Sequence, residues 1–113
     1  MKKQDFFNNL ADAIRRTNCP HMALPGNVNN ELFEEIGMNF SKSTLIMFHN
    51  TQIGHSDMLV CFDENDNVLA VKVGSPTQSF MFALNLTQML YGAKIKYYEQ
   101  SKIDSNKLII KLA

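Results

Sequence analysis

Cysteine and glycine are both scarce in this sequence, and their scarcity excludes several classes of protein. The two cysteines, Cys19 and Cys61, form no CxxC pair and are too few for a disulfide framework, so both are expected to be free thiols. No glycine-rich phosphate loop follows a predicted strand, because each of the five glycines stands alone: Gly26, Gly37, Gly54, Gly74 and Gly92. Nucleotide-dependent chemistry is therefore not supported, and no cofactor is expected.

The chain also lacks an apolar stretch of the kind that forms a membrane span or a secretion signal. Two lysines stand near its start, but polar residues follow where a signal peptide needs an unbroken apolar run. Its 113 residues, of which 45% are hydrophobic and 19% charged, have the composition of one soluble globular domain covering residues 1–113. We expect a cytoplasmic protein that does not enter a membrane.

Charge is missing from one long segment, residues 73–93, in which eleven of the twenty-one positions are apolar. The segment has the pattern of a helix that ends at Gly92, with one broad apolar face. A second apolar stripe, formed by Phe80, Leu84 and Tyr91, lies beside that face. A sheet can cover only one side of such a helix, so we predict that a partner protein, or a second copy of the chain in a homodimer, covers the stripe. The alternative is that residues 18–29 or the short helix at 31–36 of the same chain cover it.

The other elements follow from hydrophobic periodicity and turn residues. Residues 4–17 have the spacing of an amphipathic helix, and residues 31–36 (ELFEEI) that of a short helix with Gly37 at its exit, whereas residues 18–29 are expected to form a loop. The predicted strands cover residues 43–49, 57–62, 68–73, 94–99 and 107–112, and the turn DENDN closes the second and third of them into a hairpin.

This order of elements, α-α-β-β-β-α-β-β, predicts an α+β domain. Because every strand connection except the helical one is short, we expect a mostly antiparallel five-stranded sheet with the helices packed on one face. The pattern does not decide whether the last two strands join the same sheet.

Acidic side chains gather in two places, which we interpret as solvated surface that a basic partner could contact. One group lies on the short helix and the other in the hairpin turn: Glu31, Glu34 and Glu35, then Asp63, Glu64 and Asp66. Net charge is zero, but residues 1–66 hold nine acids against five bases, and such asymmetry can steer a charged partner.

Basic side chains near the end of the chain suggest a different ligand, a nucleic acid. Strand alternation places Lys94, Lys96 and Tyr98 on one side of a strand, and Lys107 and Lys111 on one side of the next. Lysines contact phosphates and an aromatic ring stacks on a base, so this hairpin is an alternative binding site for single-stranded RNA or DNA. Lysines on an outward or edge-strand face also serve solubility.

Two small sets of residues have the composition of a catalytic or metal site, and we interpret both as incidental. Cys19 and His21 lie two apart in a predicted loop, but a catalytic pair needs a third group to orient the base. His49, His55 and Asp57 flank a strand connection and offer nitrogen and oxygen ligands, without a fourth ligand or a supporting partner. We predict neither an enzyme nor a metal site.

The order of helix, three strands, an uncharged helix and two strands is similar to that of the class I secretion chaperones. These small cytoplasmic proteins dimerise and bind an extended segment of an effector, so the resemblance implies a protein-binding function; residues 18–42 are an insertion relative to it. Small immunity proteins that neutralise a toxin share the same bulk features. We therefore predict a non-enzymatic protein that neutralises or escorts another protein, with nucleic-acid binding as the alternative.

Overall fold

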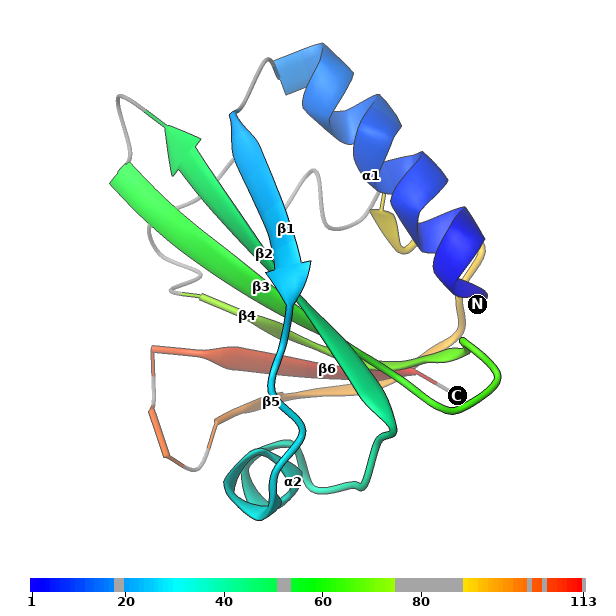
Figure 1. The fold of residues 1–113 in the computed structure, drawn as a ribbon, viewed down its shortest axis with the longest axis vertical. Coiled ribbons are helices and arrows are strands. Elements are labelled where there is room, and N and C mark those ends of the chain that lie inside the picture. Colours follow the sequence, from blue (N-terminus) through cyan, green and yellow to red (C-terminus); the bar gives the residue numbers. More distant parts are fainter. Residues whose placement is uncertain (18–19, 51–53, 75–88, 102, 105, 113) are drawn as a thin grey trace.

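The described part of the chain forms two helices and one antiparallel sheet. The computed structural model describes all residues except 18–19, 51–53, 75–88, 102, 105 and 113. In chain order the elements are α1 (Lys3–Thr17), β1 (His21–Pro25), α2 (Asn30–Ile36), β2 (Lys42–Asn50), β3 (Gly54–Phe62), β4 (Val68–Val73), β5 (Ile95–Gln100) and β6 (Leu108–Leu112). The strands are ordered β1-β2-β3-β4-β6-β5 (Figure 1). The predicted α+β class is confirmed, and the last two strands join the same sheet.

Within the described residues the sheet has six strands rather than the predicted five, because β1 lies in the segment expected to be a loop. Its sequence, HMALP, is short, does not alternate and ends in proline, so periodicity gives no strand signal there. It pairs antiparallel with β2, with Met22 opposite Met47 and Leu24 opposite Leu45. Pairing with an existing strand edge thus overrides the weak local preference.

The first layer of the core lies between α1 and one face of the sheet. The buried α1 side chains Phe6, Leu10 and Ala13 recur at three- and four-residue spacing, as predicted for residues 4–17. They pack against side chains from four strands, including Ile46, Phe48, Met58, Val60, Phe62, Val71, Val73, Ile110 and Leu112. We call this side of the sheet the α1 face.

The two described helices lie on opposite faces of the sheet, so the prediction that all helices share one face is wrong for α2. Ile36 and the nearby Phe40 form a second core cluster with Leu59, Cys61, Ala70 and Ile109. We call this side the α2 face. The central strands carry apolar side chains on both faces, and the second face needs its own cover.

Helix α2 has well-formed ends, as its sequence predicts. The Asn29 side chain accepts a hydrogen bond from the backbone N–H of Leu32 at 2.9 Å, which caps the first turn. Gly37 ends the helix with φ of 81°, a left-handed conformation that a residue without Cβ adopts at little cost, and its N–H donates to the Phe33 carbonyl.

The uncharged segment is described only at its two ends, residues 73–74 and 89–93. Phe80 and Leu84 lie outside the described residues, as does most of the helix predicted there. Met89 and Leu90 are buried in the core of the α1 face, and Gly92 has φ of 86°. The side chain of Tyr91 is 81% exposed. None of the described helices has the length and apolar character needed to cross a membrane.

The predicted turn between β3 and β4 is confirmed, and Asp63 organises it. Its carboxylate accepts hydrogen bonds from the backbone N–H groups of Asn65 and Asn67 and from the Asn67 side chain, each at 2.9 Å. These donors, the Asn67 side chain foremost, lower the pKa of Asp63 below its usual value. Ionised Asp63 is therefore the form that holds the turn.

We expect Asn67→Ala to lower the thermal unfolding midpoint by a few degrees at pH 7 and by much less in strong acid. A carboxyl whose folded pKa is lowered contributes stability above the unfolded value of about 3.9, and that stability is lost as pH falls through the folded pKa. Calorimetry between pH 7 and pH 2 measures the difference. Asn65→Ala, which keeps its backbone donor, is the control; a loss for Asn67→Ala that does not change with pH would contradict this role of Asp63.

Candidate functional site

Part of the α2 face is left uncovered by α2, and we call it the open face. It is formed by Met22 and Leu24 of β1 and by Leu45 and Met47 of β2. Leu45 packs against the core cluster of the α2 face, and cross-strand partners point to the same side of a sheet. Met22, Leu24 and Met47 are 56%, 39% and 43% exposed. These apolar side chains therefore lie together in contact with water.

A hollow of about 190 Å³ lies between the open face and α2. Its walls are mostly apolar and its charged groups come from the central strands: Pro25, Gly26, Asn27, Leu32, Leu45, Asp57, Leu59 and Lys72. A cavity of about 150 Å³ holds a benzene ring, so this hollow has room for one large side chain. Leu45 belongs to both features, which makes the hollow continuous with the open face.

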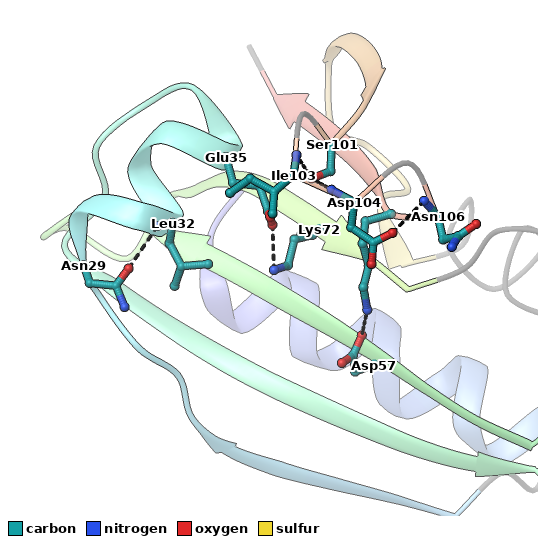
Figure 2. A network of polar contacts seen from close by, with 10 residues as sticks. Asn29, Leu32, Glu35, Asp57, Lys72, Ser101, Ile103, Asp104 and Asn106 are labelled. Atoms are coloured by element: carbon teal, nitrogen blue, oxygen red, sulfur yellow. Dashed lines mark hydrogen bonds and ion pairs between the residues drawn. The ribbon is translucent and has the colours of Figure 1, made fainter.

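Beneath α2, a carboxylate and an ammonium group form a buried ion pair (Figure 2). The Nζ atom of Lys72 on β4 lies 2.7 Å from Oε1 of Glu35, whose side chain is only 7% exposed. The interpretation of Glu35 as solvated acidic surface is therefore wrong, because the side chain turns toward the sheet and meets Lys72. No donor in the described part of the chain meets hydrogen-bond geometry at this oxygen, so the contact is mainly ionic.

A second ion pair lies beside the hollow, because one of its members, Asp57, lines the hollow. Nζ of Lys107, just before β6, donates to Oδ1 of Asp57 on β3 at 3.1 Å, and both side chains are partly exposed. The charged groups of Asp57 and Lys72, which line the hollow, are thus each matched by an opposite charge within the chain. What the hollow and the open face offer to a ligand is chiefly apolar surface.

The five residues of the predicted nucleic-acid site do not form one exposed patch. Lys94 and Lys96 are exposed, but Lys107 is paired with Asp57. Lys111 is buried, with Nζ 3.4 Å from Oε1 of Glu99.

The place of Lys111 has an electrostatic reason. A Cβ atom built on Gly37 would lie 2.5 Å from Nζ of Lys111, so this ammonium sits against the carboxyl end of α2, where a positive charge is favourable.

The strand register places Tyr98, the aromatic residue of the predicted nucleic-acid site, opposite Ile110 and not opposite Lys111.

The remaining predicted acidic residues fall into two groups. Glu31, Glu34 and Glu64 are exposed, as expected. The Asp63 carboxylate accepts hydrogen bonds within its own turn, and Asp66 accepts one from Nζ of Lys42 at 2.8 Å, which lowers the pKa of Asp66. The carboxylates of Asp63 and Asp66 are therefore engaged by neighbouring donors, and Glu64 is the acid of this turn that a partner could contact.

The cysteines and histidines considered for catalysis or metal binding are described only in part. Cys19 lies outside the described residues, and His21 begins β1 with its ring centroid 6.4 Å from that of Phe48. The register pairs His49 with His55 across β2 and β3. Within the part of the chain that the structure describes, no three His, Cys, Asp or Glu side chains are grouped as metal ligands.

Cys61 is an inert thiol. It is fully buried on the α2 face, and burial raises its pKa to about 12. At neutral pH it is therefore neutral, and it lacks the thiolate form that nucleophilic catalysis needs.

Sequence reasoning missed the open face for two reasons. Met22 and Leu24 stand in a segment with proline and no alternation, and the run STLIMFH reads as a strand covered on both sides, which conceals the exposure of Met47. The pairing of Asp57 with Lys107 joins residues fifty positions apart, and spacing carries no signal for it.

Comparison with known proteins found no matching family model, no similar curated protein and no similar solved structure.

We expect Lys72→Met to destabilise the fold by about 3–5 kcal/mol, because it leaves the carboxylate of Glu35 buried without its cation. In the double variant Lys72→Met with Glu35→Leu, most of that loss is recovered, since apolar groups replace both charges. Urea unfolding of the four proteins of this cycle gives the coupling.

Arg15→Met serves as the matched control, because Arg15 and Asp12 form a pair of the same 2.7 Å length on the exposed side of α1. Its expected cost is below about 1 kcal/mol. Equal losses for Lys72→Met and Arg15→Met would contradict a buried, interdependent Glu35–Lys72 pair.

Proposed function

We propose that this chain is a non-enzymatic, cytoplasmic protein-binding domain that neutralises or escorts another protein, such as a toxin or an effector. The observation that carries the proposal is the open face, where Met22, Leu24 and Met47 are exposed together beside an apolar hollow. Grouped apolar side chains next to a recess are typical of a surface that another protein covers.

The energetics of the open face fit a protein ligand. Completing the burial of Met22, Leu24 and Met47 would contribute about 2–4 kcal/mol, at about 1.5–3 kcal/mol for each fully buried side chain, before association costs. A side chain of the partner placed in the hollow adds to this. The exposed acids Glu31 and Glu34 of α2 stand on the same side of the sheet and favour a partner with basic residues around its apolar centre.

The uncharged segment supplies a second candidate contact in this proposal. Its stripe of Phe80, Leu84 and Tyr91 keeps the role assigned from the sequence, cover by a partner or by a second copy, and the strong exposure of Tyr91 supports that role. The open face is a separate surface, formed by β1 and β2.

Affinity capture from cells that produce the protein tests the proposal. We expect tagged wild type to retain a specific protein partner, and Met47→Glu to lose it by at least about tenfold, because a carboxylate would be buried without a cation at the centre of the contact. Ile95→Glu is the matched control: Ile95 is 38% exposed and lies on β5, at the opposite edge of the sheet.

If Met47→Glu and Ile95→Glu retain a captured protein equally, the contact lies elsewhere and the open face is not the binding surface. Co-expression then separates the two forms of the function. Growth rescued from a harmful partner indicates neutralisation, whereas a partner kept soluble and released later indicates escort.

Nucleic-acid binding remains the rival, and two exposed lysines, Lys94 and Lys96, are what it retains. We expect no binding of a labelled single-stranded RNA of about 15 nucleotides at physiological salt, because Lys107 and Lys111 are engaged within the chain. Fluorescence anisotropy across a salt series measures this. Affinity that falls steeply with salt and disappears in Lys94→Glu with Lys96→Glu would favour the rival over protein binding.

A further inference from the structure

In the described part of the chain, no strand pairs with the outer edge of β1, and Pro25 is its only common edge-blocking residue. Strand β1 is the outermost strand next to β2, all five of its residues are exposed, and it carries no Lys, Arg, Asp or Glu. Natural sheets commonly block such edges with charges or bulges. The opposite edge strand, β5, has both, since Lys96 is exposed at a register shift between Ile95 and Tyr97.

One hydrogen bond shows which residues of β1 direct their backbone groups toward β2. The N–H of Gly26 donates to the carbonyl of Ser43 at 2.9 Å, so Leu24 and Met22 also exchange hydrogen bonds with β2. The alternate residues His21, Ala23 and Pro25 direct their backbone groups away from β2. The outer edge thus offers two N–H donors and three carbonyl acceptors, and the missing N–H of Pro25 falls on the side where β2 does not need it.

These five residues form an edge that is complementary to itself, with Ala23 at its centre. We propose that two copies of this chain pair antiparallel through β1, about a two-fold axis at Ala23. In this arrangement the two Ala23 residues exchange a pair of hydrogen bonds, and each His21 N–H donates to the Pro25 carbonyl of the second copy. Both outward N–H groups, those of His21 and Ala23, therefore meet a carbonyl of the second copy. Pro25, which has no N–H, contributes only its carbonyl.

The side chains agree with this pairing. Met22 of one copy lies opposite Leu24 of the other, so the exposed apolar groups of the two edges cover each other. No charged residue of β1 faces a like charge across the axis. A five-residue edge is smaller than a standard interface of about 800 Å² per partner, so we expect a weak, concentration-dependent dimer.

The pairing extends the surface proposed for protein binding. A two-fold axis perpendicular to the sheet keeps the α2 faces of both copies on the same side, so Leu45, Met47 and the hollow of each copy lie on one twelve-stranded surface. Self-association is measured on the purified chain alone, so it can fail while partner binding through Met47 stands, and the reverse is also true.

Sedimentation velocity over a hundredfold range of concentration tests the proposal. We expect wild type to shift from monomer to dimer, and Ala23→Pro to weaken the dimer by about tenfold or more, because it removes the central pair of intermolecular bonds. Ala23→Pro takes no hydrogen bond from β2, since this N–H points outward. Ala23→Val keeps the N–H group and is expected to retain the dimer.

Wild type that stays monomeric throughout, or a dimer unchanged by Ala23→Pro, would overturn the proposal; the latter result would locate the contact elsewhere.

Disulfide cross-linking tests the register of the two β1 strands in the dimer, and it does not depend on whether Ala23→Pro folds. In a Cys19→Ser background, Ala23→Cys is expected to form an intermolecular disulfide, because the two Cα atoms lie about 5.5 Å apart in the proposed pair. His21→Cys is the control, since its two copies lie about 14 Å apart and cannot bridge. Equal cross-linking of both variants, or none of Ala23→Cys, would contradict pairing centred on Ala23.

Discussion

The central strands of this sheet carry apolar side chains on both faces, and the need to cover two faces governs the rest of the structure. Helix α1 covers one face along its fifteen residues. On the other face, α2 has only seven residues and packs over one end. Because α2 is much shorter than α1, it leaves Met22, Leu24 and Met47 in contact with water. The open face is a consequence of this shortfall.

Charge is handled on the α2 face by internal pairing. Three lysines on or beside the sheet each form an ion pair with a carboxylate: Lys72 with Glu35, Lys107 with Asp57 and Lys111 with Glu99. Pairing lets lysine stems line an apolar layer while their ammonium groups remain neutralised. The same pairing keeps the hollow mainly apolar, and this is why we propose a protein ligand over a nucleic acid.

The sequence predicts those parts whose signals are local. Helix α1 follows from apolar periodicity, the end of α2 from Gly37, and the turn at Asp63 from its run of turn-forming residues. The role of Glu35 could not be predicted, because its partner Lys72 is brought near by tertiary packing. Strand β1 has no periodic signal of its own and forms on the edge of β2. The proposed contacts of Phe80 and Leu84 stay predictions, since these residues lie outside the described part.

In the described structure the open face is in contact with water, and we propose that another molecule binds it. Methyl NMR of methionine-labelled protein, at concentrations where the chain is monomeric and with a soluble paramagnetic probe, tests this claim most directly. We expect strong broadening of the Met22 and Met47 methyl signals, while the buried Met58 and Met89 keep theirs. Equal protection of all four methyl groups in the monomer would show that the chain already covers this surface and would contradict the claim.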